Sequence, residues 1–295
     1  MIHVPAELAE SQVRYNGEAG RAFVAALPGR AEEFLGRWGL RLDGPSLHGA
    51  ASLVLPVRRS DGTPAALKLQ LLDEETEGEA VALRAWDGDG VVRLLEHDPE
   101  TGTMLLERAD SARHLSRLGD VGEAVRILAG LLARLSAVPA PRGLRRLDAV
   151  AARMLARVPG AVARLGARDA ALLADCAAAV REVAGEPGDR LLHWDVHYDN
   201  VLGAEREPWL VIDPKPLSGD PGFELLPALT NLWNPDPVEI RWRFDLLTER
   251  LGLDRERALA WTLGRVLQNG LWEVEGGEDE LGAVQVAVAR ALLAR

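Results

Sequence analysis

The chain has 295 residues, of which 47% are hydrophobic and 27% are charged, and its formal net charge is −11. These are ordinary values for a globular protein that can bury one large core or two lobes. The acidic balance argues against nucleic acid or an anionic membrane as a partner, and it is compatible with a cationic substrate.

The chain shows no targeting or spanning segment. Its first residues lack the basic and then apolar pattern of a secretory signal, and no apolar run approaches the ~20 residues of a membrane helix. Cys176 is the only cysteine, so no disulfide can form within the chain, and its Ala-rich surroundings predict a buried small side chain. We therefore expect a cytoplasmic protein without a membrane partner.

The first third of the chain combines two helices with strands. A helix is expected over 18–38, and Pro28-Gly29 is expected to interrupt it. The pattern then changes to strands over 40–42, 52–57 and 64–71, with a small-residue loop at 46–51. An acidic helix over 73–86 and a strand pair over 91–95 and 103–107 complete this part.

The remainder of the chain is mainly helical. Helical spacing of apolar residues, with Pro and Gly breaks, predicts helices over 121–138, 147–165, 170–184, 223–233, 238–251, 254–273 and 280–293. Asp220 is expected to cap the helix that begins at residue 223. An antiparallel sheet followed by helices places the chain in the α+β class.

The stretch 191–214 carries the most specific pattern. An H-x-D-x-H-x-x-N motif is formed by His193, Asp195, His197 and Asn200. Two apolar runs around a polar turn, 201–202 and 209–212, predict a hairpin that brings Asn200 and Asp213 together at its open end. The side-chain oxygens of Asn200 and Asp213 are the kind of ligand that Mg²⁺ prefers. Protein kinases use the same order of residues for phosphoryl transfer: a catalytic Asp, an Asn five residues later, and a metal-binding Asp after a hairpin.

This motif, followed by Ile212-Asp213-Pro214, resembles that of the aminoglycoside phosphotransferases, which are relatives of the protein kinases. HWDVHYDNVL and IDPKPLSGDPGFELLP are most similar to the streptomycin 6-kinase branch, also called the aminoglycoside/hydroxyurea resistance kinases, over about residues 43–272. Trp194 stands where many members have glycine, which we interpret as a feature of this branch. The resemblance implies a two-lobed, protein-kinase-like fold, with a small antiparallel sheet in an N-terminal lobe (1–108) and a mostly helical C-terminal lobe (109–295).

The resemblance also implies ATP and Mg²⁺ as cofactors. In a kinase-like fold Lys68 bridges the α- and β-phosphates, and lysine occurs only at Lys68 and Lys215 among 34 basic residues, which favours a specific role. A glutamate of the acidic helix holds this lysine. Glu79 is the predicted partner, and Glu75, about one helical turn earlier, is the alternative.

Two further segments are expected to contact the nucleotide. Ser46 and Gly49 lie in the small-residue loop that covers the phosphates in such a fold, where glycine permits close backbone approach. Glu107 and Ala109 lie at the predicted hinge between the lobes, where backbone groups read the adenine.

The motif residues receive distinct predicted roles. Asp195 positions the acceptor hydroxyl and accepts its proton, while Asn200 and Asp213 bind Mg²⁺. His193 and His197 are expected to support the loop, and Lys215 either meets the γ-phosphate or has a scaffold role. A transition-metal cluster of His193, Asp195 and His197 is the rival interpretation. It leaves the other kinase-like residues without a role.

The acceptor side is the least determined. In this family the C-terminal helices form the acceptor pocket, so Trp272, Glu273 and Glu275 are predicted to bind a polyhydroxylated cation such as streptomycin. Alternatively, these three residues form the end of an ordinary amphipathic helix, and the sequence fits both interpretations equally well. The predicted function is ATP-dependent phosphorylation of an aminoglycoside hydroxyl by a monomer. The alternatives are a kinase of an amino sugar or other hydroxylated metabolite, and a nucleotide-binding protein without transferase activity.

Overall fold

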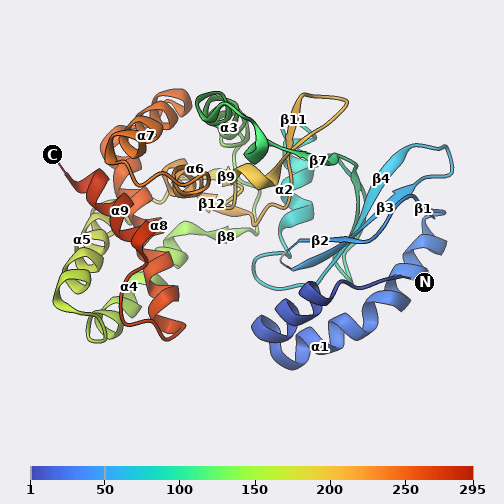
Figure 1. Ribbon diagram of the computed structural model, residues 1–295, viewed down its shortest axis with the longest axis horizontal. Coiled ribbons are helices and arrows are strands. Elements are labelled where there is room, and N and C mark those ends of the chain that lie inside the picture. Colours follow the sequence, from blue (N-terminus) through green and yellow to red (C-terminus); the bar gives the residue numbers. More distant parts are fainter. Residues whose placement is uncertain (1, 50, 295) are drawn as a thin grey trace.

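The structure is a computed structural model that describes residues 2–49 and 51–294. It has two lobes (Figure 1): an antiparallel sheet flanked by helices, and a larger, mainly helical body. This arrangement confirms the predicted α+β, kinase-like class. No helix in these described residues is long and apolar enough to cross a membrane.

The N-terminal lobe is built around one six-stranded sheet with the order β1-β3-β4-β6-β5, in which β2 also pairs with β3 and every pair is antiparallel. Its elements are α1 (Ala6–Arg37), β1 (Arg41–Leu42), β2 (Leu47–His48), β3 (Ser52–Arg58), β4 (Pro64–Gln70), α2 (Glu79–Trp86), β5 (Leu94–Asp98) and β6 (Thr103–Glu107).

Strand alternation decides which face of this sheet each side chain occupies. Leu67 and Leu69 of β4 are fully buried in the core that the sheet forms with α1. Because neighbouring side chains on a strand point to opposite faces, Lys68 points away from α1. On that other face, Met104, the register partner of Lys68, packs with Leu83 and Trp86 of α2. The sheet therefore directs Lys68 toward α2 and the C-terminal lobe.

The C-terminal lobe contains helices and two three-stranded sheets, ordered β11-β10-β7 and β8-β12-β9. Its elements are β7 (Asp110–His114), η1 (Leu115–Arg117), α3 (Val121–Leu135), β8 (Arg145–Arg146), α4 (Leu147–Val162), α5 (Ala167–Val183), β9 (Arg190–Leu192), η2 (Tyr198–Asn200), β10 (Val201–Gly203), β11 (Trp209–Val211), β12 (Leu217–Gly219), η3 (Pro221–Glu224), α6 (Leu225–Thr230), α7 (Pro237–Leu251), α8 (Arg255–Glu275) and α9 (Ala283–Leu293). The predicted boundary between 1–108 and 109–295 lies in the short connection from β6 to β7.

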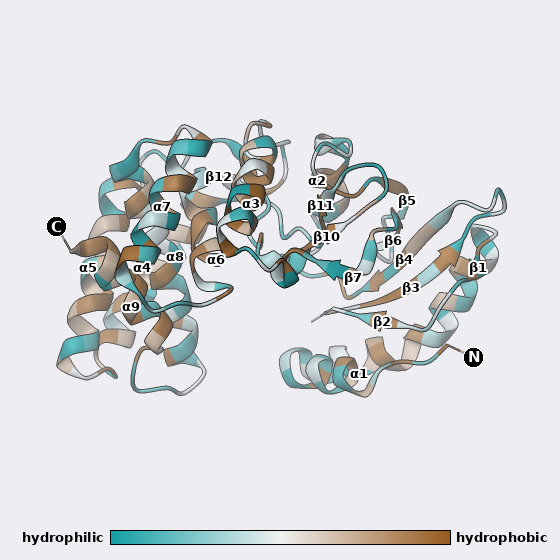
Figure 2. Ribbon diagram, turned by 45° about the horizontal axis from the view of Figure 1, so that its top comes forward, coloured by the Kyte–Doolittle hydropathy of each residue, from teal (hydrophilic) through white to brown (hydrophobic). Residues whose placement is uncertain are grey.

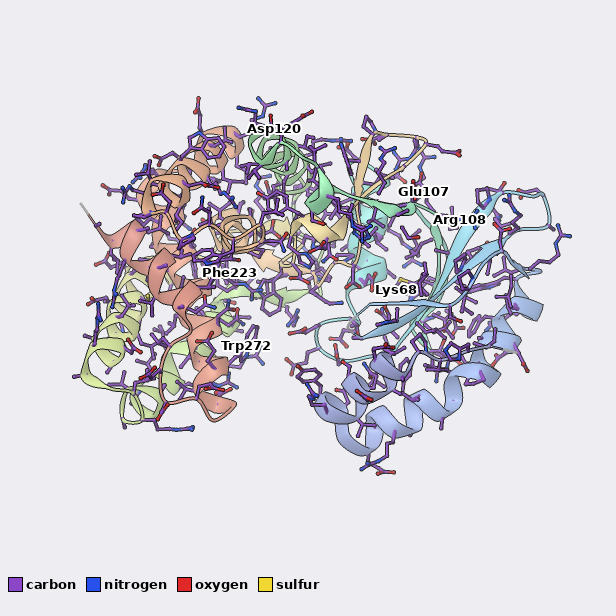
Figure 3. The ribbon with its side chains drawn as sticks, viewed as in Figure 1. Lys68, Glu107, Arg108, Asp120, Phe223 and Trp272 are labelled. Atoms are coloured by element: carbon purple, nitrogen blue, oxygen red, sulfur yellow. The ribbon has the colours of Figure 1, made fainter. Side chains whose placement is uncertain are left out.

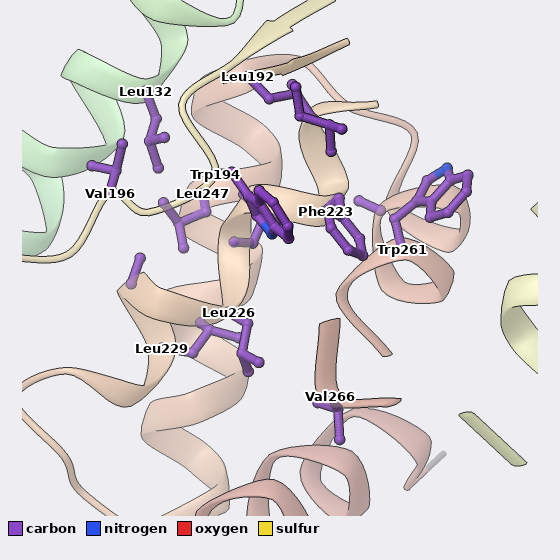
Figure 4. Close-up of a cluster of buried hydrophobic side chains, with 14 of the residues drawn as sticks. Leu132, Leu192, Trp194, Val196, Phe223, Leu226, Leu229, Leu247, Trp261 and Val266 are labelled. Carbon is purple, nitrogen blue, oxygen red and sulfur yellow. The ribbon is translucent and has the colours of Figure 1, made fainter. Parts of the chain in front are cut away.

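One large hydrophobic core holds this lobe together. The helices carry both hydrophobic and hydrophilic bands (Figure 2), so each buries one side. Trp194, Phe223 and Trp261 lie in a row within that core (Figure 4). The rings of Phe223 and Trp261 meet edge to face, with centroids 6.1 Å apart. Because Trp194 belongs to the H-x-D motif, the motif loop is anchored directly in this core.

The first helix departs from its predicted form. It begins at Ala6, and its kink is at Gly17, where φ is 55°, while Pro28 remains inside the helix. A positive φ is readily adopted by glycine, so the kink at Gly17 agrees with a helical segment that starts at residue 18, whereas the interruption expected at Pro28-Gly29 is absent. The predicted loop 46–51 contains the short strand β2, and its residue 50 lies outside the described residues.

Two further boundaries differ from the prediction for a local reason. The acidic helix begins at Glu79 and not at residue 73, because the Asp73 carboxylate accepts the backbone N–H groups of Glu75 (2.8 Å) and Thr76 (2.9 Å). Such a turn competes with the first helical turn. The strand expected over 91–95 runs from 94 to 98, because Val91 instead bridges to Val211 of β11.

Candidate active site

His193 ties the motif loop to the hairpin. Its side chain is fully buried, and Nε2 lies 3.0 Å from the carbonyl oxygen of Ile212. Since a carbonyl only accepts, Nε2 carries the proton, and Nδ1 is left to accept the backbone N–H of Asp195 at 3.3 Å. Burial lowers the His193 pKa to about 3. A neutral ring with both nitrogens engaged is a structural element of the loop and is not available as a metal ligand.

Asp195 is held from the other side by Asn200. The Asn200 Nδ2 group donates to the Asp195 carbonyl oxygen at 2.9 Å and reaches its carboxylate at 3.4 Å. Burial raises the pKa of Asp195, while the charges of His197 and Arg265 act in the opposite direction. Because the Asn200 amino group is committed to Asp195, its amide oxygen is the atom left for a cation.

Asp213 lies at the open end of the hairpin next to Asn200. The strands pair Val201 with Val211, and the N–H of Ile212 donates to the Asn200 carbonyl oxygen at 2.9 Å. Asp213 has φ 61°, a left-handed conformation that is uncommon outside glycine. This backbone turn directs its carboxylate toward Lys68 of the N-terminal lobe, whose Nζ lies 2.5 Å away. The predicted convergence of Asn200 and Asp213 is present in the fold.

Two lysines set the charge of Asp213. Burial would raise its pKa, but Lys68 and Lys215 outweigh burial and hold the pKa well below the usual range. The Lys215 Nζ lies 3.2 Å from the Asp213 carboxylate. Asp213 is therefore an anion at any physiological pH, which is the form in which a carboxylate binds Mg²⁺.

Lys68 is held by two carboxylates. Its Nζ lies 2.6 and 2.8 Å from the two oxygens of Glu79, and the side chains of Lys68 and Glu79 are only 4% and 1% exposed. Burial would lower the Lys68 pKa, but Asp213 and Glu79 raise it, so the ammonium stays charged. Between the two glutamates considered for this lysine, the structure puts Glu79 beside it, while Glu75 lines a cavity elsewhere.

The predicted hinge lies between the two sheets (Figure 3). The Glu107 carboxylate binds Arg206 of the hairpin turn at 2.9 and 3.0 Å, and its backbone N–H donates to the Arg93 carbonyl oxygen. In the described ranges, the N–H and C=O of Ala109 make no hydrogen bond. The Glu107 side chain therefore fastens the connection to the C-terminal lobe, and the Ala109 backbone is the part left free to bind a ligand.

The other predicted nucleotide contacts lie at the edge of the N-terminal sheet. The N–H of Gly49 donates to the Ser52 carbonyl oxygen at 3.0 Å, which closes the turn between β2 and β3. Ser46 immediately precedes β2. Both residues therefore stand in a short hairpin on the same sheet as Lys68.

A cavity of about 320 Å³ adjoins Asp195, and we call it the Asp195 cavity. Its lining residues are Asp195, His197, Leu226, Pro227, Thr230, Asn231, Arg265 and Asn269. A second cavity, of about 370 Å³, lies between the segment that follows β4 and the helices α4 and α8, and we call it the inter-lobe cavity. Its lining residues are Asp73, Glu74, Glu75, Arg145, Val150, Arg153, Met154, Arg157, Trp194, Gln268 and Trp272.

Of the three residues predicted to bind the acceptor, only Trp272 lines either cavity. Glu273 accepts from the Gly282 N–H at 2.9 Å and from Gln285 at 3.3 Å, near the start of α9. Glu275 pairs with Arg157 at 3.2 Å. Glu273 and Glu275 are therefore engaged by other residues of the chain, and Trp272 is the member of this set that is open to a ligand.

Arg265 is a site residue that the sequence reasoning missed. It is only 8% exposed, lines the Asp195 cavity, and stacks on the rings of Trp194 (5.0 Å) and Trp272 (5.6 Å). Burial lowers its pKa to about 10, so it remains charged. The signal was present in the sequence: Arg265 is a lone charge between Gly264 and Val266 on the most apolar part of its helix.

Glu224 is a second missed residue. It is fully buried, and one carboxylate oxygen accepts a hydrogen bond from the backbone N–H of Trp194 at 2.6 Å. Its other oxygen has no hydrogen-bond partner in the described residues. Burial raises the Glu224 pKa from 4.5 to about 7, against the opposing effect of its backbone donors and Arg265. The carboxyl therefore positions the backbone of the H-x-D motif and titrates near neutral pH.

Glu224 gives the fold a predictable pH dependence. Between about pH 4.5 and 7 the unfolded carboxyl releases its proton and the folded one keeps it, so stability falls as the pH rises through this window. The pKa difference corresponds to roughly 3 kcal/mol. Glu224→Gln keeps the accepting oxygen and cannot ionise, so it should lose less stability than the wild type between about pH 5 and 8. Urea unfolding at both pH values measures the free energy of unfolding of each protein. An equal loss of stability in the wild type and in Glu224→Gln would contradict the prediction.

The chain is similar to known proteins over most of its length. Residues 37–277 match the model of a family described as aminoglycoside/hydroxyurea antibiotic resistance kinase. A hydroxyurea phosphotransferase from Kitasatospora aureofaciens is 64% identical, over 100% of this chain and 87% of that protein. A streptomycin 6-kinase from Streptomyces glaucescens is 57% identical, over 99% of this chain and 97% of that protein.

A solved structure bears on the fold. An aminoglycoside phosphotransferase in ternary complex with AMP-PNP and hygromycin B aligns with a TM-score of 0.63 at 16% identity, over 90% of this chain and 99% of that chain. This likeness concerns the fold alone, and it agrees with the two lobes described above. Because a family model matches most of the chain and relatives match nearly all of it, the chain belongs to the aminoglycoside/hydroxyurea antibiotic resistance kinases and is an ATP-using small-molecule phosphotransferase.

Proposed function

We propose that the protein transfers the γ-phosphoryl group of ATP to a hydroxyl of a streptomycin-like aminocyclitol, with Mg²⁺ as the metal. The observation that carries this proposal is the meeting of two lobes at Asp213. The Lys68–Glu79 pair comes from the sheet, Asn200 and Asp213 come from the hairpin, and a cavity opens beside Asp195. These are the parts that kinase-type phosphoryl transfer requires.

Asp195 is the proposed catalytic residue. It faces the Asp195 cavity, where it can accept a hydrogen bond from the acceptor hydroxyl and then take its proton. A loose phosphoryl transition state needs an aligned oxygen more than a strong base. The contacts from Asn200 and His193 hold the backbone of Asp195 in place, which favours such alignment.

The nucleotide is proposed to lie under the N-terminal sheet. Lys68 contacts its phosphates, the hairpin with Ser46 and Gly49 covers them, and the free backbone groups of Ala109 bind the adenine. The proposal also includes a boundary between the two lobes near residue 108. It further includes a cytoplasmic location, where ATP is available.

Asn200 and Asp213 are the residues that would hold Mg²⁺. An amide oxygen to which no residue in the ranges 2–49 and 51–294 donates, and a carboxylate held in its ionised form, fit a hard divalent cation. The ion would supply positive charge at the β- and γ-phosphates. The geometry speaks against the rival cluster of His193, Asp195 and His197. His193 is engaged at both nitrogens, and no group of three or more His, Cys, Asp or Glu in the described ranges is arranged for a metal.

The metal assignment predicts the effect of metal removal. Excess EDTA should abolish transfer, and added Mg²⁺ should restore it. Asp213→Asn removes the charge of one ligand, so the Mg²⁺ concentration for half-maximal rate should rise by roughly tenfold or more. A coupled ATP-turnover assay over a Mg²⁺ series measures this. Full activity in EDTA, or an unchanged Mg²⁺ requirement for the variant, would remove the metal from the proposal.

The relatives support two candidate acceptors. One relative is named a streptomycin 6-kinase, which favours the hydroxyl at position 6 of streptomycin, and another is named a hydroxyurea phosphotransferase. The first acceptor is a large cation and the second is a small neutral molecule. The net charge of −11 favours the cation as the principal substrate.

The proposed activity is tested directly by product analysis. Purified protein is incubated with Mg-ATP and either streptomycin or hydroxyurea, and the products are examined by mass spectrometry and ³¹P NMR. We expect one phosphoryl group on streptomycin, as an ester at position 6. ADP formation without any phosphorylated acceptor would contradict the assignment.

A further inference from the structure

The inter-lobe cavity is lined by residues of both lobes. Its N-terminal side is formed by the acidic segment Asp73–Glu75 that follows β4, and its C-terminal side is formed by α4, α8 and Trp194. In Figure 3, Trp272 lies on the side of the C-terminal lobe that faces the N-terminal lobe. With about 370 Å³ this cavity, like its neighbour at Asp195, is at the small end of the ~300–1,000 Å³ range of ligand pockets.

The carboxylates of this cavity are not equivalent. Asp73 is engaged by backbone N–H groups of its own segment, and Glu74 pairs with Arg153 at 3.2 Å. The Glu75 side chain makes no hydrogen bond or ion pair with any residue in the ranges 2–49 and 51–294. Three arginines also line this cavity, of which Arg153 pairs with Glu74 and Arg157 with Glu275, while the charge of Glu75 acts on Arg145 and Arg265 without a direct contact. Glu75 is therefore the carboxylate of this cavity whose oxygens are open to a ligand.

The opposite wall offers an aromatic surface. Trp272 is 42% exposed and contacts the guanidinium of Arg265 on one side. A free carboxylate and an exposed indole that line one cavity suit a planar cation, because the carboxylate accepts its N–H groups and the ring binds its face. A guanidinium group has both properties.

Trp194 separates this cavity from the Asp195 cavity. The guanidinium groups of Arg145 (4.4 Å) and Arg265 (5.0 Å) both contact its ring. Trp194 lines the inter-lobe cavity, while Arg265 lines the Asp195 cavity. The two cavities therefore adjoin across one layer of side chains. Trp194 has φ 68°, a left-handed conformation that is costly for a bulky residue.

Unsatisfied donors also mark this layer. Trp194 is only 4% exposed, and its indole N–H has no hydrogen-bond partner in the described residues, nor has Nε of Arg265 or of Arg145. Buried donors without acceptors cost free energy. The layer is thus built from bulky and charged groups at a local energetic cost, next to both cavities.

We propose that the inter-lobe cavity is the second half of the acceptor site, in which Glu75 and Trp272 bind a guanidinium group of a large aminocyclitol while its reacting hydroxyl lies at Asp195. A small neutral acceptor such as hydroxyurea needs only the Asp195 cavity. This inference rests on the proposed function. It makes Glu75 a specificity-determining residue that is contributed by the N-terminal lobe, so binding of the cation joins the two lobes.

The test uses a matched pair of charge variants. Glu75→Gln and Glu77→Gln remove the same charge from the same segment, but Glu77 is exposed and does not line the cavity. Calorimetric titration of each full-length protein with streptomycin should show roughly ten- to a hundredfold weaker binding for Glu75→Gln and unchanged binding for Glu77→Gln. Trp272→Ala should also weaken binding, and Trp272→Phe should recover most of it.

Turnover separates this inference from the proposed function. Glu75→Gln should lower the ratio of kcat/KM for streptomycin to that for hydroxyurea, mainly through KM for streptomycin. Wild-type protein that binds streptomycin through Glu75 but never phosphorylates it would contradict the proposed function and leave the cavity assignment standing. Equal affinities for the two charge variants, or no streptomycin binding by the wild type, would overturn the cavity assignment.

Discussion

Replacing Asp195 with alanine should lower the rate of phosphoryl transfer by roughly 10²–10⁴-fold, the usual range for a positioned acid or base. The carboxylate faces the Asp195 cavity, and its backbone is fixed by the Asn200 amide and the His193 ring. Nucleotide affinity should change little, because Lys68 and Asp213 are held by other contacts. Single-turnover kinetics measure the transfer step, and titration with a fluorescent ATP analogue measures binding.

Asp199→Asn is the matched control for this variant. Asp199 lies in the same loop, is half exposed, and bonds Ser116 and Asn231 without lining the Asp195 cavity. The asparagine retains polar atoms for these contacts, so transfer should remain near the wild-type rate. Near wild-type turnover of Asp195→Ala with the true acceptor would show that the base has been assigned wrongly.

The second large effect is expected at Lys68. Lys68→Ala removes the proposed phosphate contact, so both ATP binding and transfer should fall steeply. It also leaves Glu79, which is fully buried, without its counter-charge. Breaking a buried pair in this way typically costs about 3–5 kcal/mol of stability. Denaturant unfolding should therefore show a destabilised protein together with the loss of activity.

The pair Lys68 and Glu79 should behave as a coupled unit. Glu79→Ala should reduce ATP binding and transfer more mildly than Lys68→Ala, because Glu79 orients the ammonium without touching the phosphate. The double variant has no isolated buried charge, so it should lose less stability and less activity than the sum of the single variants. Strictly additive losses would show that the 2.6 Å contact does not matter for the site.

Much of this site could be predicted because it depends on local patterns. The alternation of β4 places Lys68 opposite Leu67 and Leu69, and that alternation is visible in the sequence. The hairpin was equally local: two short apolar runs around a turn bring Asn200 and Asp213 to one end. The kinase-like fold, the family and the phosphotransferase class are confirmed, whereas the individual residue roles remain predictions.

What could not be predicted depends on packing between distant segments. Glu273 and Glu275 looked equivalent to Trp272 in sequence, but α9 and Arg157 engage them, and neither partner is visible from the end of α8 alone. The inter-lobe cavity was hidden for the same reason, because it needs the segment after β4 to face α4 and α8. The shortened α2 reflects a side-chain turn at Asp73, which helical periodicity does not report.

The most direct test of the central claim is a crystal structure with Mg²⁺, a non-hydrolysable ATP analogue and streptomycin. The account predicts that the metal lies between the Asn200 amide oxygen and the Asp213 carboxylate, that Lys68 contacts the phosphates while still bound to Glu79, and that an acceptor hydroxyl lies within hydrogen-bonding distance of Asp195. A metal held by His193 and His197, or a nucleotide bound away from Lys68, would contradict it.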